Sequence, residues 1–374
     1  MKLVVFARSL HRGGAERQVV NLVNGLADKG FNVDLILMLA EGPYMKLIRR
    51  DKVSVLDLGR NARLDLVKSF LLFCKYINKS RPAIIYSFLP VPNLFLIPVK
   101  VLFPKLVIIW GVRASGIDYK NYPLLVKFIY KIQFLLSFIP NAIVVNSFCG
   151  RNILLENGVR KKIYVIHNGI DTSCFTFSKK KRIQYRKKLL VKNQILITIV
   201  GRADPMKGHE IFIKAAAEYL SIRNDVFFLF VGSRETKFYR EYLLNITELR
   251  KLEGCSKWVE DEEDMVAVYS ATDILTSSSY YGEGFSNVLA EGMSCGTICI
   301  GTNVGDSKCI VNQDFLIDPY KYDELKNAWN KAINLLKSPE INDFRKRARN
   351  DVLRKFSISS MTDKTIKVFK EISN

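Results

Sequence analysis

Short, almost continuously apolar segments alternate with amphipathic segments along the whole chain. The first apolar series lies at 2–7, 33–39, 84–88, 106–110, 142–146 and 163–166. A second series lies at 195–200, 226–231, 274–277 and 297–300. Helical periodicity falls between them, at 15–29, 209–221, 239–252, 262–271 and 286–295. Apolar strands that alternate with helices predict parallel sheets covered by helices on both faces.

The two series predict two doubly wound α/β domains, and a length of 374 residues favours the same number. We expect an amino-terminal domain at 1–172, a basic linker region at 173–192, a carboxy-terminal domain at 193–345 and a helical tail at 346–374. In such domains ligands bind at the carboxyl ends of the strands. Two domains facing a central crevice therefore suit an enzyme that joins two substrates.

The segment 282–292, which reads GEGFSNVLAEG, is the strongest candidate site. A predicted strand leads into this glycine-containing loop, and a helix follows with Ser286 as its N-cap. The free N–H groups of a first helical turn bind anions, and Gly284 lets a phosphate or sugar approach the backbone. Glu283 and Glu291 could bind hydroxyls on opposite sides of a bound diphosphate. Isolated glutamates are usually solvated surface acids, but their spacing around this loop favours a site.

A second candidate is the segment 200–209, VGRADPMKGH, between a predicted strand and a predicted helix. Arg202 and Lys207 can converge on one diphosphate, the arginine as a planar fork and the lysine as a point charge. Solvated loop cations would give the same pattern. His209 opens the helix, and we expect it to be exposed.

The third candidate follows the first strand, where residues 12–17 read RGGAER. The segment lacks the third glycine of the dinucleotide-binding fingerprint and the Gly-Lys-Ser/Thr of a P-loop, which disfavours NAD binding and ATP hydrolysis. A tight turn from strand to helix explains it equally well.

Together these segments resemble glycosyltransferase family 4, the retaining nucleotide-sugar transferases with the GT-B fold. The resemblance rests on 13–16 (GGAE), 168–171 (NGID), Gly201-Arg202 with Lys207-Gly208, and Glu283-x7-Glu291, in the family's order. The run 282–291 is particularly similar to bacterial enzymes that build capsule, O-antigen or other surface polysaccharides. The resemblance implies the α/β GT-B fold, with a carboxy-terminal helix that crosses back to the first domain.

The resemblance also implies residue roles. Glu283 would contact the donor sugar and Glu291 the nucleotide ribose. Arg202 and Lys207 would neutralise the diphosphate leaving group, with Gly14 lying against it. The other donor-binding candidates are Gly284, Phe285, Ser286 and Asn287.

Gly13 and Arg113 are the acceptor-side candidates. Many relatives have a histidine after the fourth or fifth strand of the first domain, but residues 108–115 here read IIWGVRAS. Polysaccharide-type members often have a Gly-x-Arg segment there, as this chain does. We expect His11 and His167 to be loop residues with structural or neutral roles.

The residues present predict a reaction without a metal or other cofactor, because no Asp-x-Asp motif is evident. Arg202, Lys207 and the helix amides at 285–287 would stabilise the departing diphosphate. The resemblance implies that the sugar keeps its anomeric configuration and that the leaving phosphate takes the acceptor proton. A UDP-sugar is the favoured donor over a GDP-sugar, with a lipid-linked or saccharide acceptor.

The basic excess lies in the first half of the chain. Residues 1–190 hold 32 Lys+Arg against 10 Asp+Glu, whereas residues 191–374 hold 25 against 26. Within the basic half, 122–138 is rich in Leu, Phe and Ile, and Lys120, Lys127 and Lys131 fall on one side of a helix. Such a segment can dock on an anionic membrane surface, although an ordinary helix packing its apolar face on the sheet would look similar.

The remaining features place the protein in the cytoplasm, peripherally on the inner face of the membrane. The seven cysteines contain no CxxC pair, which fits a reducing compartment. The first residues form too short an apolar run for a signal peptide, and no uninterrupted apolar run of about 18 residues occurs.

Two alternative functions remain. The first is another GT-B-type enzyme, such as a sugar-nucleotide epimerase, which acts without an acceptor. The second is a non-enzymatic basic protein that binds membranes or nucleic acid, although no nucleic-acid-binding motif supports it and we expect no nucleic-acid partner.

Overall fold

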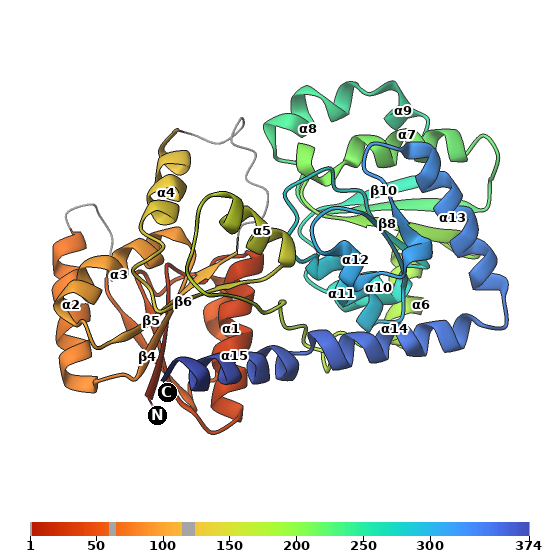
Figure 1. Cartoon of the computed structure of the whole chain (residues 1–374). Coiled ribbons are helices and arrows are strands. Elements are labelled where there is room, and N and C mark those ends of the chain that lie inside the picture. Colours follow the sequence, from red (N-terminus) through yellow and green to blue (C-terminus); the bar gives the residue numbers. More distant parts are fainter. Residues whose placement is uncertain (1, 60–64, 114–123, 374) are drawn as a thin grey trace. The chain divides into compact units, whose positions relative to one another are not determined.

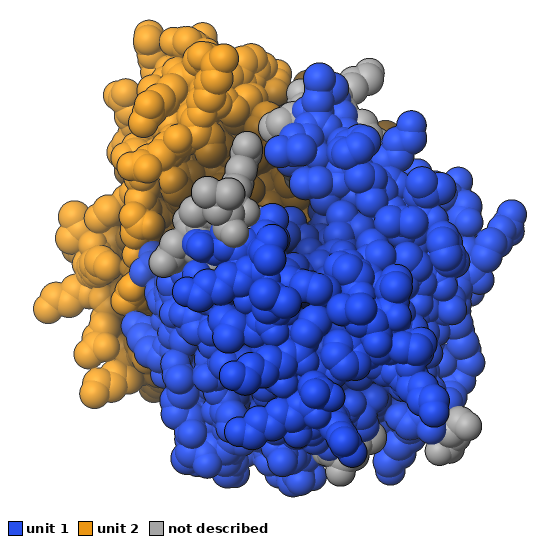
Figure 2. Space-filling view, turned by 90° about the vertical axis from the view of Figure 1, so that its left-hand side faces the viewer, with its two compact units in different colours: residues 1–169, 357–374 blue, residues 170–356 orange. Residues whose placement is uncertain are grey.

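The computed structural model describes residues 2–59, 65–113 and 124–373 (Figure 1). These residues form two compact units (Figure 2). Unit 1 contains residues 1–169 and 357–374, and unit 2 contains residues 170–356. The last helix therefore belongs to the first unit, which confirms the predicted crossing back.

Unit 1 is built on a seven-stranded parallel sheet with the order β3-β2-β1-β4-β5-β6-β7. The strands are β1 (Lys2–Ala7), β2 (Asn32–Leu37), β3 (Val53–Asp57), β4 (Ile84–Phe88), β5 (Val107–Val112), β6 (Ala142–Val145) and β7 (Ile163–Val165). Successive side chains of a strand point to opposite faces. Accordingly Leu3 and Val5 lie in one buried cluster and Val4 and Phe6 in another, so each face of the sheet has its own core.

Helices cover both faces of this sheet. They are α1 (Gly14–Asp28), η1 (Pro43–Leu47), α2 (Asp65–Ser80), α3 (Pro90–Leu102), α4 (Leu124–Leu135), α5 (Phe148–Glu156) and α15 (Ile358–Ser373). On one face α1 and α15 lie side by side (Figure 1), with Val23 and Phe369 in the same cluster. Gly25 allows this close approach, because a Cβ there would lie 2.4 Å from Thr362 Oγ1. The other face packs against α2 and α3.

Unit 2 repeats the plan with a six-stranded parallel sheet, ordered β10-β9-β8-β11-β12-β13. The strands are β8 (Ile195–Val200), β9 (Val226–Val231), β10 (Ser256–Val259), β11 (Ile274–Ser277), β12 (Ile298–Thr302) and β13 (Leu316–Ile317). In both sheets the order reverses between the first and fourth strands of the unit, as in doubly wound folds. The reversal lies between β1 and β4 in unit 1 and between β8 and β11 in unit 2.

The helices of unit 2 also form two layers. They are α6 (Lys179–Leu189), η2 (Pro205–Lys207), α7 (His209–Tyr219), α8 (Lys237–Glu241), η3 (Leu243–Asn245), α9 (Thr247–Arg250), α10 (Met265–Ala271), α11 (Asn287–Ser294), α12 (Ser307–Ile310), η4 (Gln313–Phe315), α13 (Tyr322–Lys337) and α14 (Ile341–Phe356). Phe212 of α7 and Trp329 of α13 fill the core of one face. Tyr269, Leu289 and Val352 lie in a second cluster, which α10, α11 and α14 supply.

The basic segment expected as a linker region lies inside unit 2. Its helix α6 buries Tyr185 and Leu189 and packs against α10. Two of its arginines bind one carboxylate, with Arg182 Nη2 2.7 Å and Arg186 Nη1 3.1 Å from Asp273. The positive charges of α6 therefore do not prevent it from packing, because the buried side chains and this ion pair fix it to the unit.

Two further predictions differ from the structure. The single helix expected at 239–252 is divided into α8, η3 and α9, with Ile246 in an extended conformation between the last two. This division lets Leu243, Ile246 and Leu252 all enter one core. The pattern also missed β3, β10 and β13, which lie at sheet edges. Edge strands are less buried, and β3 and β10 accordingly lack a continuous apolar run.

None of the helices within the described ranges combines the length and the apolar character that crossing a bilayer requires.

Candidate functional site

The donor-side candidates lie on two loops at the carboxyl edge of the unit 2 sheet. Residues 201–208 follow β8, and residues 278–286 follow β11. These two strands are neighbours at the point where the strand order reverses. In open α/β sheets this is the position where ligands bind. Gly208 brings the two loops together: it has a φ of 65°, and a Cβ there would lie 1.9 Å from Ser278 O.

Lys207 and Glu283 form an ion pair between these loops. The Glu283 carboxylate also accepts a hydrogen bond from Ser279 Oγ at 3.1 Å. The side chains of Lys207 and Glu283 are only 24% and 12% exposed. A partly buried pair is screened less by water than a surface pair, so the two charges hold each other in a fixed position. Ser279 was not among the predicted site residues, since a single serine in a loop carries no motif.

Arg202 lies on the same loop as Lys207 but is oriented differently. Its side chain is 69% exposed, and its Nη2 lies 3.9 Å from Asp204 Oδ2. The structure thus brings Lys207 to Glu283 and leaves the Arg202 guanidinium in solvent. Asp204 has a second role, because its Oδ1 accepts a hydrogen bond from Met206 N at 3.1 Å and fixes the turn that carries Lys207.

The glycine-containing loop leads directly into α11. Ser286 is the N-cap of this helix, as predicted, and its side chain accepts a hydrogen bond from Leu289 N at 3.5 Å. Phe285 is buried against Phe356, with ring centroids 5.0 Å apart. Gly284 O accepts a hydrogen bond from Asp306 N at 2.8 Å. These contacts fix the start of α11 at Asn287, where the first-turn N–H groups and the helix dipole favour an anion.

Glu291 lies inside α11 and is buried. Its Oε2 accepts a hydrogen bond from Tyr269 Oη at 2.9 Å. Burial and then the Glu291 charge raise the pKa of Tyr269 well above its ordinary value, so the phenol stays protonated and remains a donor. Glu291 is therefore not a solvated surface acid. Sequence reasoning missed Tyr269, because a tyrosine within α10 looks like any other core residue.

The expectation that His209 is exposed is wrong. The ring is fully buried and stacks on Trp258, with centroids 5.5 Å apart and planes at 15°. Gly208, in a left-handed conformation, starts α7 at an angle that turns this first side chain inward. Burial, with a smaller contribution from the Lys207 charge, lowers the pKa of His209 to about 3. His209 is therefore neutral at physiological pH.

We expect His209 to make the fold sensitive to acid. Between pH 6.5 and about 3, the unfolded chain binds a proton that the folded chain does not. The free energy of unfolding should therefore fall by about 1.4 kcal/mol per pH unit over this range. The variant His209→Phe should lose less stability than the wild type on acidification from pH 6.5 to 5, in urea unfolding followed by fluorescence. His11→Phe, at an exposed position, is the control, and equal acid sensitivity of wild type and His209→Phe would contradict this assignment.

In unit 1, Gly13 and Gly14 lie where the loop that follows the carboxyl end of β1 leads into α1. Gly13 is the residue before α1, and Gly14 is the first residue of that helix. The turn is tight, because Gly13 O accepts a hydrogen bond from Arg17 N at 3.1 Å and a Cβ on Gly13 would meet the Glu16 carboxylate. The loop after β1 adjoins the reversal point of this sheet, between β1 and β4.

Arg113 follows β5 and is held by three neighbours. Its Nη1 donates to Asn168 Oδ1 at 2.9 Å, its Nη2 donates to Tyr86 Oη at 3.2 Å, and its guanidinium lies 4.8 Å from the Phe88 ring centroid. The 168–171 motif thus contributes the buried acceptor that orients this cation. Sequence reasoning did not connect the two segments, which lie 55 positions apart. Residues 114 and 115 of the same segment lie outside the described residues.

Gly169 fixes the adjacent backbone to α1 and α15. Its N–H donates to Gln18 Oε1 at 2.8 Å, and its carbonyl accepts from Asn21 Nδ2 at 2.8 Å. A Cβ at this position would lie 3.0 Å from the Ile358 Cα. The glycine of the motif therefore has a packing role within unit 1.

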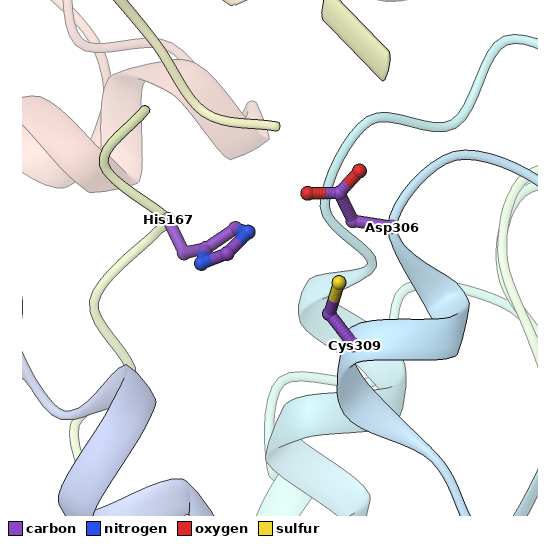
Figure 3. A group of neighbouring side chains, drawn as sticks. All are labelled: His167, Asp306 and Cys309. Carbon is purple, nitrogen blue, oxygen red and sulfur yellow. The ribbon is translucent and has the colours of Figure 1, made fainter. Parts of the chain in front are cut away.

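Figure 3 shows three side chains with metal-ligating atoms, His167, Asp306 and Cys309. Asp306 precedes α12 and Cys309 lies within it, both in unit 2, whereas His167 belongs to unit 1. Zinc sites use at least three protein ligands, so this group gives neither unit a complete set. Burial, and then the Asp306 charge, raise the pKa of the Cys309 thiol, which makes it a poorer metal ligand since the thiolate is the binding form.

Two family models match the chain in succession. Residues 12–173 match the model described as Glycosyltransferase Family 4, and residues 180–351 match the model described as Glycosyl transferases group 1. The first match covers most of unit 1 and the second most of unit 2.

Curated relatives match parts of the chain. A UDP-Gal:alpha-D-GlcNAc-diphosphoundecaprenol alpha-1,3-galactosyltransferase of Escherichia coli is 27% identical over 211 residues, 54% of this chain and 52% of that protein. A D-inositol 3-phosphate glycosyltransferase of a Mycobacterium species is 30% identical over 159 residues, 41% of this chain and 34% of that protein. The matches thus span about half or less of the length of these relatives.

A solved structure matches the whole chain. The crystal structure of Anabaena HepE in complex with UDP-glucose superposes with a TM-score of 0.84 at 19% identity, covering 99% of this chain and 100% of that one. This likeness and the two doubly wound units show the GT-B fold, as the resemblance implied.

Proposed function

Because the chain combines a Glycosyltransferase Family 4 domain and a Glycosyl transferases group 1 domain in the GT-B fold, we propose that it is a retaining glycosyltransferase. The observation that carries the proposal is the Lys207–Glu283 pair beside the start of α11, at the reversal point of the unit 2 sheet. This arrangement offers a cation and helix amides for a diphosphate, with a carboxylate for sugar hydroxyls.

The donor in this proposal is a UDP-sugar and the acceptor a lipid-linked saccharide. HepE was crystallised with UDP-glucose, and the name of the Escherichia coli relative specifies a UDP-sugar and a diphosphoundecaprenol-linked acceptor. Both favour UDP as the nucleotide. The similarity of 282–291 to enzymes of capsule and O-antigen synthesis suggests a surface polysaccharide as the product.

In the proposed reaction the bond between the sugar anomeric carbon and the diphosphate oxygen breaks. The sugar gains oxocarbenium character and the diphosphate gains negative charge. Lys207, Arg202 and the N–H groups at the start of α11 would stabilise that charge in place of a metal ion. The departing phosphate takes the proton of the acceptor hydroxyl, and the new bond forms on the face that the diphosphate leaves.

The Lys207–Glu283 pair would prepare the site for this step. Glu283 neutralises Lys207 while the diphosphate is absent, and Ser279 keeps the carboxylate at the loop. When the diphosphate binds, Lys207 acquires a second anion, and Glu283 becomes available to the hydroxyls of the donor sugar. Preorganised charges of this kind need little rearrangement during the reaction.

Product analysis tests the proposal. The purified chain is incubated with UDP-sugars, with and without a sugar-diphosphoundecaprenol acceptor, and nucleoside diphosphate release is measured. We expect release that depends on the acceptor, continues in EDTA and gives a product of unchanged anomeric configuration. Epimerised sugar or equal release without acceptor would favour the epimerase, and an inverted linkage or loss of activity in EDTA that Mg²⁺ restores would overturn the mechanism.

Docking on an anionic membrane would give access to such an acceptor. The helix α4 exposes much of its apolar surface, with Leu124 82% and Phe128 60% exposed, while Gln133 is its one buried residue. Phe134 of the same helix packs against the unit 1 core, so α4 has one packed side and one exposed apolar side. Lys131 is exposed on the same helix and Lys127 is partly exposed. Lys120 and residues 122–123 of the segment lie outside the described residues.

We expect binding to vesicles that contain anionic lipid, weakening as salt is added. Each basic residue near such a surface contributes about 1 kcal/mol. The double variant Lys127→Glu/Lys131→Glu should therefore reduce cosedimentation strongly. Lys367→Glu/Lys370→Glu, on α15 at the opposite face of the unit 1 sheet, is a control with the same charge change. Equal failure of the wild type to bind neutral and anionic vesicles would contradict docking and point to a soluble acceptor.

A further inference from the structure

Unit 2 contains a pocket at the amino ends of its strands, whereas Lys207 and Glu283 follow the carboxyl ends. The pocket has a volume of about 460 Å³, within the usual range for small-molecule sites. Thr272 and Thr297, which lie two residues before β11 and one residue before β12, form part of its lining. The ends of α10 and α11 and side chains of α6 and α14 complete it. The lining residues include none of the predicted donor-side residues, although Tyr269, the partner of Glu291, is among them.

The lining of this pocket is strongly cationic. Arg182 of α6 and Arg345, Lys346 and Arg349 of α14 contribute to it, and no acidic residue does. The carboxylate of Asp273 lies nearby, but it already binds Arg182 and Arg186 and accepts a hydrogen bond from Leu196 N at 2.8 Å. The pocket therefore has an excess of positive charge.

Two of these arginines are held in place by backbone carbonyls. Arg182 Nη1 donates to Ala271 O at 2.9 Å, and Arg349 donates to Thr172 O and Phe175 O, both at 3.0 Å. Cations at the ends of α10 and α11 also interact favourably with the helix dipoles. These contacts explain why Arg182 and Arg349 are present without a ligand, and they fix both guanidinium groups beside the pocket.

Arg345 is not held by backbone carbonyls in this way. Within the described ranges it makes no hydrogen bond or ion pair, and its Nε is buried without a partner. Burial lowers the pKa of its guanidinium, and the Asp273 charge offsets only part of this shift. A partly buried charge is costly when the carboxylate near it, here Asp273, already pairs with two other arginines. An anion in the pocket would remove that cost.

The pocket also has an apolar wall. Phe177 lies at its lining with 52% of its surface exposed, although most large aromatic side chains are buried in cores. An aromatic ring beside several cations suits a ligand that joins an anionic group to a ring or another apolar group.

We propose that this pocket binds a phosphate monoester, with the phosphate on Arg345 and Lys346 and the organic group against Phe177. Arginine forks match the geometry of phosphate oxygens, and several cations suit a dianion better than a carboxylate. The volume exceeds what inorganic phosphate needs, which leaves room for an organic group. The pocket lies at the opposite strand ends from the donor-side loops, so such a ligand would not compete with a nucleotide sugar. This inference does not depend on the proposed function.

Calorimetry and thermal unfolding of the full chain test this site with inorganic phosphate and phenyl phosphate, against sodium chloride at equal ionic strength. Saturating ligand should raise the Tm by about 2 °C or more. Arg345→Gln should weaken phosphate binding about 10-fold or more, and Lys346→Gln, at an exposed position, should weaken it without affecting the fold. Arg354→Gln is the matched control, because it removes an exposed arginine from the same helix that pairs with Asp351.

A competition experiment separates this pocket from the donor site, where Lys207 would also bind phosphate. With UDP at saturation, the phosphate binding that depends on Arg345 should be unchanged, since the donor-side loops lie at the carboxyl ends of the strands. Phenyl phosphate should bind more tightly than inorganic phosphate to the wild type, and Phe177→Ala should abolish that difference. A phosphate effect no larger than that of chloride, or one that saturating UDP removes and Arg345→Gln leaves intact, would overturn the proposal. Equal affinity of the wild type for both phosphates would overturn the role of Phe177.

Discussion

Lys207→Met is expected to slow sugar transfer by roughly 10²-fold or more, the usual effect of removing one preorganised charge contact. Methionine keeps much of the length of the lysine side chain but lacks its charge. In the structure Lys207 is three-quarters buried and fixed by Glu283, so no other group can easily replace it. Steady-state kinetics with a UDP-sugar should show the loss mainly in kcat, because the diphosphate charge grows as the sugar departs.

Arg202→Met should also lower the rate by roughly 10²-fold, but with a different signature. Its side chain is 69% exposed and is not fixed by Glu283 as Lys207 is. Part of its effect should therefore appear in KM. Lys214→Met is the control, since Lys214 pairs with Glu210 on the surface of α7 at 2.7 Å. If Lys207→Met keeps more than half of the wild-type rate, the cation at the diphosphate has been misassigned.

A double variant distinguishes the effect of the ion pair on stability from the effect of the Lys207 charge on the reaction rate. Lys207→Met leaves the partly buried Glu283 carboxylate without its counter-ion, which could lower stability as well as rate. Lys207→Met/Glu283→Gln removes both charges and restores neutrality. The urea midpoint of the double variant should lie nearer to the wild type than that of Lys207→Met, while the activity stays low. A double-mutant cycle then gives the coupling between the two charges.

The sequence predicted the central strands and the loops of the site for a clear physical reason. Strands such as β1 and β8 are buried on both faces and therefore read as continuous apolar runs. The cap at Ser286 and the glycines follow local rules of backbone geometry. By contrast β3 and β10 lie at sheet edges, where the apolar pattern fades.

The contacts that complete the site could not be predicted in the same way, because they join distant segments. Lys207 meets Glu283 across 76 positions, and Arg113 meets Asn168 across 55. Each partner belonged to a recognised motif, but only the topology of the sheets brings the motifs together. The prediction for His209 was wrong for another reason, because it followed a local rule. A polar residue at the start of a helix is normally exposed, and here the turn at Gly208 buries it against Trp258.

Glu283, in the loop before α11, and Glu291, within α11, should affect different kinetic constants. Glu283 lies beside Lys207 at the loop, where the reacting sugar would bind, whereas Glu291 is buried against Tyr269 one to two turns into the helix. Glu283→Ala should therefore lower turnover more than nucleotide affinity. Glu291→Ala should weaken nucleotide binding, because the ribose does not take part in bond breaking.

The role of Glu291 is best tested with conservative variants, because removing its carboxylate also lowers stability. Glu291→Ala leaves the buried Tyr269 hydroxyl without its acceptor, which costs about 1–3 kcal/mol of stability. Glu291→Gln keeps an acceptor oxygen and should weaken UDP binding without that loss. Tyr269→Phe keeps the Glu291 carboxylate but removes the hydrogen bond that holds it. This variant should therefore weaken UDP binding less than Glu291→Gln does. Calorimetry with UDP, beside kcat for each variant, separates these effects. Near-wild-type turnover in Glu283→Ala, or unchanged UDP affinity in Glu291→Gln, would show that the two carboxylates do not divide the donor between them as proposed.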